Sequence, residues 1–211
     1  MESFRKLLAA SKVQFQLVTA ANFLLCILLA LSTPLIFGIA NLDETASSYV
    51  LERYFSLSGP LLFTPLFFPE QNPGIREMAE SKRTGFSYVL GVRVLQSVLL
   101  LLLLTSAFLG VMAACGCEFH TGRMLFGTFC SALFLGTLGF TVCAFFGNLV
   151  AGYLVCAGYF MLNFFAGDKL GNFYLFSLSA GSLEEKYWLL AGSILLFACS
   201  FTWRFFVQKK R

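Results

Sequence analysis

PEQNPGIREMAESKRT, residues 69–84, is the charged stretch that decides how this sequence folds. Long apolar runs enclose it on both sides, at residues 61–68 and 88–114. Because those runs are too apolar to lie in water, we expect the charged stretch to lie at a membrane surface, between two membrane-spanning arms. The alternative is a solvated polar loop that only joins two spans.

The stretch has the residue pattern of a short, two-faced helix. Asn72 is a suitable N-cap, and Pro73 suits the first helical position, where a missing N–H costs nothing. Gly85 follows as a stop signal. Ile75, Met78 and Ala79 recur at helical spacing on an apolar face. Arg76, Glu80 and Arg83 recur at helical spacing on a charged face. We therefore predict a helix of roughly 12 residues within 69–85, about 18 Å long.

Composition places the chain among membrane proteins. Of its 211 residues 58% are hydrophobic and only 12% are charged, with a mean hydropathy of +0.78. Soluble domains carry about 25% charged residues, so the predicted fold class is an all-α integral membrane protein. Five of the seven cysteines lie in apolar runs, where they behave as small hydrophobic residues and predict no disulfide framework. The first apolar run lacks a small-x-small cleavage site, so we expect no cleavable signal peptide.

Six stretches approach the roughly 20 residues that a helix needs to cross a bilayer. The predicted spans are 17–40, 49–68, 86–114, 124–146, 149–166 and 187–207. Pro34 predicts a kink in the first span, and residues 41–48 form a short acidic loop. Residues 1–15 mix basic and apolar side chains, as an interfacial helix does, although a frayed basic tail has the same composition. The tight turn at Gly147 and Asn148 predicts that the fourth and fifth spans are antiparallel neighbours, with small residues allowing close approach.

Basic residues predict the orientation of these spans. Ten of them fall on one side, namely Arg5, Lys6, Lys12, Arg76, Lys82, Arg83, Arg204, Lys209, Lys210 and Arg211. Only three fall on the other, namely Arg123, Lys169 and Lys186. We therefore expect both termini and residues 69–84 in the cytoplasm, which requires an even number of spans.

Few residues have the spacing of a chemical site. Cys115, Cys117 and His120 could supply three metal ligands, but C-x-C is not the usual spacing and a fourth ligand is missing, so we expect no metal. No Ser elbow of the G-x-S-x-G type accompanies the histidine. No phosphate loop of the G-x-x-x-x-G-K-[ST] type occurs, so any ATP that drives this protein must bind another chain.

Three charged residues lie in or near the predicted spans and are functional candidates by default. Glu52 and Arg53 are adjacent, so on a helix they point about 100° apart and need not pair with each other. Both lie near the outer end of their span, where they could instead reach lipid headgroups. Arg93 could extend to the cytoplasmic surface or face a polar cavity.

The order of these features resembles the permease subunit of type 2 ATP-binding cassette (ABC) transporters. PEQNPGIREMAESKRTGFSYVLGVRVLQS, residues 69–97, is similar to that family's acidic lead-in, short helix, basic end and basic-marked entry to the third span. NFYLFSLSAGSLEEKYWLL, residues 172–190, is similar to the family's external re-entrant region before the last span. The family's commonest form has a Gly-Thr pair after a glutamate where this sequence has residues 77–80, EMAE, so the resemblance is one of architecture more than of signature.

The resemblance implies a role for each segment. Residues 1–15 would be an interfacial elbow helix, residues 69–85 a cytoplasmic coupling helix, and residues 167–186 an external re-entrant segment. The coupling helix would dock in a cleft of a separate ABC ATPase subunit, through the apolar Ile75 and Met78 and through polar contacts of Arg76, Glu77, Glu80, Lys82 and Arg83. Two permeases, identical or related, and two ATPases would form the transporter. ATP and Mg would bind the ATPase, with no catalytic site, cofactor or metal in this chain.

The expected function is thus that of a membrane permease in an ATP-driven exporter of a peptide, a lipid or another amphipathic compound. We expect a multi-pass protein of a bacterial plasma membrane, embedded in the lipid bilayer and with no nucleic-acid partner. Two alternatives remain open from the sequence. One is a non-transporting immunity or assembly factor that binds a partner through the same helix, and the other is an intramembrane enzyme.

Overall fold

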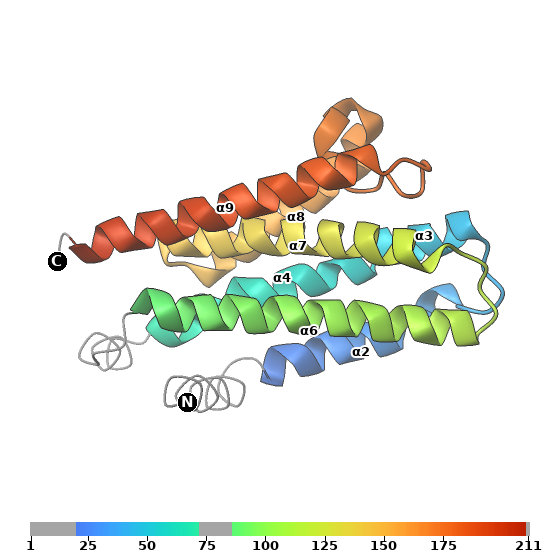
Figure 1. Cartoon of the computed structure of the whole chain (residues 1–211), viewed down its shortest axis with the longest axis horizontal. Coiled ribbons are helices and arrows are strands. Elements are labelled where there is room, and N and C mark those ends of the chain that lie inside the picture. The colour runs from blue at the N-terminus through green and yellow to red at the C-terminus, as the bar shows by residue number, and fades with distance from the viewer. Residues whose placement is uncertain (1–19, 72–85, 210–211) are drawn as a thin grey trace.

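The computed structural model describes residues 20–71 and 86–209, which form a bundle of helices with no strand in either range (Figure 1). The long helices are α2 (Ala20–Phe37), α6 (Phe86–Ala114), α7 (Thr121–Phe146), α8 (Leu149–Ala166) and α9 (Glu184–Lys209). The short helices are α3 (Glu44–Arg53) and α4 (Ser58–Phe63), with the 3-10 helices η2 (Phe55–Leu57), η3 (Thr64–Gln71) and η4 (Gly167–Phe173). The helix predicted at residues 1–15 lies outside the described ranges. So does the helix predicted at residues 69–85, except for residues 69–71, which end η3.

Within residues 20–71 and 86–209, five helices are long and apolar enough to cross a membrane. They are α2, residues Leu90–Ala114 of α6, α7, α8 and residues Glu184–Trp203 of α9. The bounds of α6 and α8 are those of the predicted spans 86–114 and 149–166, while the other three helices overlap the predicted first, fourth and sixth spans. Pro34 lies inside α2, which ends one turn later at Phe37. The described chain therefore has the helices of a multi-pass membrane protein.

The second predicted span, residues 49–68, is not the single helix that the sequence suggested. Helical structure begins earlier, at Glu44, because Asp43 caps α3, and the predicted loop 41–48 is partly helical for the same reason. The chain then continues through η2, α4 and η3 as a broken run, residues 44–71.

Two prolines account for the breaks in this run. Proline has no N–H, so Pro60 and Pro65 cannot donate to the carbonyls of Ser56 and Leu61, four residues before them. The backbone tightens into 3-10 turns next to both prolines. Backbone of this kind is tolerated at membrane depth where protein surrounds it. The run is indeed enclosed, since its large side chains Leu51, Phe55, Leu62, Phe63 and Phe67 are buried.

Helix α7 is the centre of the bundle. It is buried over 72% of its apolar window, against 11–39% for the other four long helices, because α4, α6, α8 and α9 all pack on it. Small residues permit this contact, as the sequence predicted for membrane helices. A Cβ on Gly59 of α4 would lie 1.8 Å from the carbonyl oxygen of Ala132, and one on Gly139 would lie 2.3 Å from Thr64 Oγ1.

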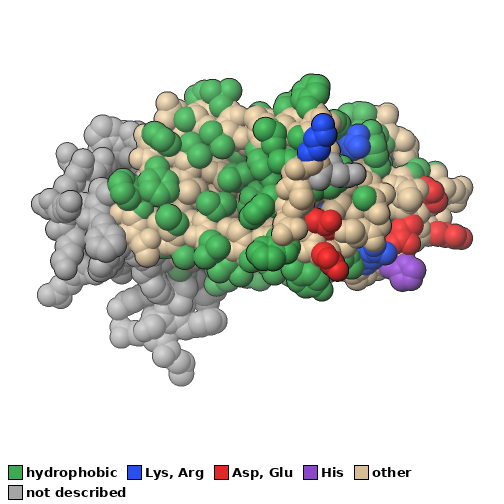
Figure 2. Space-filling model, turned by 90° about the horizontal axis from the view of Figure 1, so that it is seen from above, with side chains coloured by type: hydrophobic (Ala, Val, Ile, Leu, Met, Phe, Trp, Pro, Cys, Tyr) green, Lys and Arg blue, Asp and Glu red, His purple; other side chains and the backbone are tan. Residues whose placement is uncertain are grey.

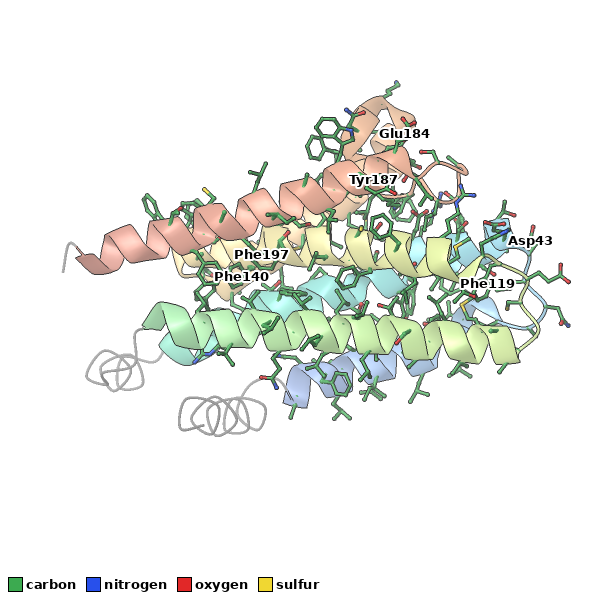
Figure 3. All side chains as sticks on the ribbon, in the orientation of Figure 1. Asp43, Phe119, Phe140, Glu184, Tyr187 and Phe197 are labelled. Carbon is green, nitrogen blue, oxygen red and sulfur yellow. The ribbon has the colours of Figure 1, made fainter. Side chains whose placement is uncertain are left out.

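Figure 1 shows that α2 and α6 begin, and that α9 ends, at one end of the bundle. The loops before α3 and α7 and the start of α9 lie toward the other end, where Figure 3 labels Asp43, Phe119 and Glu184. Figure 2 shows apolar side chains over the middle of one face, with the charged side chains of described residues gathered toward this second end. We call it the acidic end, after Asp43, Glu44, Glu118, Glu184 and Glu185.

Candidate functional site

Helix α3 places a carboxylate inside the protein. Asp43 begins this helix by accepting hydrogen bonds from the Thr45 hydroxyl (2.6 Å) and the Ala46 amide (3.0 Å), which also hold the pKa of Asp43 below its usual range. Two and a half turns later, the helix carries Glu52 among buried residues, with 0% of the side chain exposed. An ionised carboxylate without water is stable only when it is paired and hydrogen-bonded.

Lys186, in the first turn of α9, neutralises this carboxylate. Its side chain is also fully buried, and its Nζ lies 2.5 Å from Glu52 Oε1. The same Nζ donates to the Ser131 hydroxyl of α7 and to the carbonyl of Leu175, both at 2.6 Å. A lysine ammonium has three donors, so all of them are used.

Glu52 also binds backbone amides of the α8–α9 connection, residues 167–183. Its Oε1 accepts from the Leu178 amide at 2.9 Å, and its Oε2 accepts from the Ser179 amide at 3.1 Å. The carboxylate thus receives three hydrogen bonds, one of them from the ammonium. We refer to the side chains of Glu52, Ser131 and Lys186, with the backbone groups of residues 175, 178 and 179, as the Glu52–Lys186 cluster.

The α8–α9 connection folds against the bundle because further side chains satisfy its backbone. Asn163 of α8 accepts from the Leu175 amide at 2.7 Å, and the Tyr159 hydroxyl donates to the carbonyl of Phe173 at 2.5 Å. Gly171 and Gly181 have positive φ angles of 55° and 83°, which let the chain turn on both sides of this stretch. In a lipid environment each of these backbone groups needs such a partner.

Arg53 points away from the cluster, as expected from the helical spacing of adjacent residues. Its guanidinium lies over the ring of Tyr49, 3.9 Å from the centroid, and its Nη1 donates to the Tyr49 hydroxyl at 2.6 Å. The rings of Phe164 and Phe176 lie at 4.9 Å and 5.3 Å. Attraction between a cation and aromatic rings therefore holds α3 against α8 and the connection. The headgroup interpretation does not hold for Glu52, because its side chain is fully buried.

Arg93 joins the two elements that border residues 72–85. From the third turn of α6, its Nη1 donates to the carbonyl of Leu66 in η3 at 3.0 Å. Arg93 thus contacts the backbone of the broken run. Because this contact depends on the fold, it could not be predicted from single positions of the sequence.

The loop residues Cys115, Cys117 and His120 take separate partners. The Cys117 thiol donates to the carbonyl of Ile39 at 3.1 Å, while His120 Nδ1 lies 3.3 Å from Glu44 Oε2. Cys115 is a free, half-buried thiol. Within the residues that the structure describes, no group of three or more His, Cys, Asp or Glu is arranged to hold a metal ion.

The cluster brings together one residue that sequence analysis singled out and two that it did not. Lys186 was counted with the basic residues outside the membrane, yet its side chain and that of Ser131 are fully buried. The sequence did contain a signal for this pair. Glu52 and Lys186 have opposite charges, and each lies near the end of an apolar run, on the side of the acidic end of the bundle. The predicted ATPase-coupling residues lie outside the described ranges, namely Ile75, Arg76, Glu77, Met78, Glu80, Lys82 and Arg83.

The cluster is a joint between four parts of the chain, α3, α7, α9 and the α8–α9 connection. Its three ammonium donors are all used inside the chain, so the cluster links these four parts to one another. Comparison of the chain with protein-family models, with curated proteins and with solved structures found no match.

Proposed function

We propose that this chain is the membrane permease subunit of an ATP-driven exporter of the type 2 ABC class. The observation that carries the proposal is the course of the broken run, residues 44–71. It leads from the Glu52–Lys186 cluster, near the acidic end, to Gln71 at the opposite end, within the charged stretch that begins at residue 69. A force applied to that stretch reaches the interior through this run.

The second arm of the stretch is α6, and the two arms are tied together. Because Arg93 donates to the Leu66 carbonyl, a displacement of the run acts on α6 as well. An ATPase that binds residues 75–83 would thus move both arms. ATP and Mg bind that ATPase. Transport is driven because the contacts between the ATPase and this chain differ between the two states of the ATPase.

The rest of the proposal concerns the assembly. A second permease, identical or related, completes the transporter in a bacterial plasma membrane, with both termini in the cytoplasm and the substrate path between the two copies. The substrate class is a peptide, a lipid or another amphipathic compound. The fully satisfied polar groups of the cluster support a transport subunit over an intramembrane enzyme, because they leave no ammonium donor free for chemistry.

Isolation of the tagged chain from its native membrane in a mild detergent tests this function. We expect an ABC ATPase subunit to co-purify in stoichiometric amount and to hydrolyse ATP. Isolation of the intact chain without any ATPase would contradict the proposal and favour a non-transporting partner-binding protein.

Charge reversals locate the contact. Glu80→Lys and Arg83→Glu should stay in the membrane but bind the ATPase about tenfold more weakly or worse, because like charges placed together at an interface cost several kcal/mol. Lys169→Glu is the matched control, since Lys169 is exposed in the α8–α9 connection, at the far end of α8 from its tight turn with α7. Equal ATPase retention by all three variants would place the contact elsewhere.

A further inference from the structure

We propose that Glu52 is a positioning residue that makes the α8–α9 connection move together with the broken run 44–71. This inference rests on the proposed function, because it concerns how motion that begins at the ATPase reaches the opposite end of the bundle. The transfer of this motion to the connection is assigned to the carboxylate of Glu52 and to two backbone amides.

The connection is held in two separate places. Its first part, around residue 175, is bound to α7, α8 and α9 through Ser131, Asn163 and Lys186. Its second part is bound to the run, because the amides of Leu178 and Ser179 both donate to Glu52. Glu52 is thus the point at which the run holds the connection.

Separation at this point is costly for both partners. If the run moved away without the connection, two amides and the fully buried Lys186 ammonium would lose their acceptor. If the connection moves with the run, both amide hydrogen bonds of Glu52 are retained. A movement of the two as one body is therefore favoured.

The connection also has a surface on which such a movement can be measured. A hollow opens there, lined by Gly171, Tyr174, Ser177, Ala180 and Glu185. Ala180 is exposed and lies one residue beyond Ser179, so its surroundings report directly on the part of the connection that Glu52 holds.

The test measures thiol labelling at this position. Cys115, Cys117 and Cys199 are replaced by serine, which leaves four buried cysteines, and Ala180→Cys introduces the reporter. The complex with its ATPase is labelled by a maleimide with and without a non-hydrolysable ATP analogue. We expect two different labelling rates in this parent.

Two sets of variants separate positioning from folding. Glu52→Met with Lys186→Met replaces the ion pair by apolar side chains of similar size, an exchange that buried pairs often tolerate, but it removes the acceptor of both amides. We expect this variant to fold, to bind the ATPase and to hydrolyse ATP, while its labelling rate no longer responds to the nucleotide. Ser131→Ala, which removes a contact of the same lysine with α7, should keep the response.

Failure of this inference can be told from failure of the proposed function. If no ATPase binds the parent, the proposed function fails and this inference fails with it. If the ATPase binds but the parent shows no nucleotide response, or if the double variant retains the full response, the inference alone is overturned. Loss of the response in Ser131→Ala would also overturn it, because the whole cluster would then matter only for folding.

Discussion

A carboxylate that has no water around it takes its stability from its neighbours, and Glu52 shows how completely a membrane protein can provide them. The ammonium of Lys186 neutralises the charge, and two amides donate hydrogen bonds to the carboxylate oxygens. Sequence analysis found Glu52 by its place in an apolar run, but not its partner, because 134 positions separate the two residues. A pair of residues so far apart in the sequence is brought together by the fold and produces only a weak signal in the sequence.

The first prediction concerns the stability of this pair. Glu52→Ala leaves a buried ammonium without its partner and should destabilise the protein by about 3–5 kcal/mol. Glu52→Met with Lys186→Met should destabilise it less, because it leaves two amides without their acceptor but no unpaired charge. Thermal unfolding in detergent measures both. Glu184→Ala, an exposed glutamate in the same turn of α9, is the control and should leave the melting temperature unchanged. A single variant as stable as the double variant would show that the charges are not buried together.

At the scale of elements, the long helices were predictable and the broken run was not. The runs of α6 and α8 are continuous and are bounded by turn residues, such as Gly147, whose φ of 65° ends α7, and Asn148, whose side chain caps α8. The course of residues 44–71 depends instead on the local effect of two prolines and on packing against α7. That packing cannot be predicted from a local sequence pattern.

The contact between α4 and α7 makes the second prediction. Gly59→Ala would place a methyl group 1.8 Å from the Ala132 carbonyl, so the two helices must separate, at a cost of about 1–3 kcal/mol or more. Gly158→Ala is the matched control, because a Cβ there meets nothing within 4 Å and alanine is the better helix former. We expect a lower melting temperature for the first variant only. Similar values for both would argue against the close approach of α4 and α7.

At the scale of the whole molecule, the described chain starts and ends at the same end of the bundle, where η3 also ends and α6 begins (Figure 1). The acidic side chains lie at the other end, as far as the described residues show. The uneven distribution of lysine and arginine predicts that these two ends lie on opposite sides of the membrane. Which end faces the cytoplasm is a matter for experiment.

The third prediction therefore concerns orientation. Alkaline phosphatase, which is active only outside the cytoplasm, should be active when fused after His120, and a fluorescent protein that matures in the cytoplasm should fluoresce when fused to the C-terminus. Three helices, α7, α8 and α9, separate the two fusion points, so the reporters should lie on opposite sides of the membrane. Reporters on the same side would contradict the bundle, and exchanged sides would contradict only the orientation.

The bond from Arg93 to the Leu66 carbonyl has a consequence for how such a protein can diversify. It keeps η3 and the start of α6 at a constant spacing, independently of the residues that lie between them. The interval 72–85 can then be treated as an interchangeable cassette: its sequence can be replaced, by evolution or by an engineer, while the packing around α7 stays as it is. If this interval binds the ATPase as proposed, a chimaera that exchanges only this interval would bind a new partner and keep the packing of its own bundle.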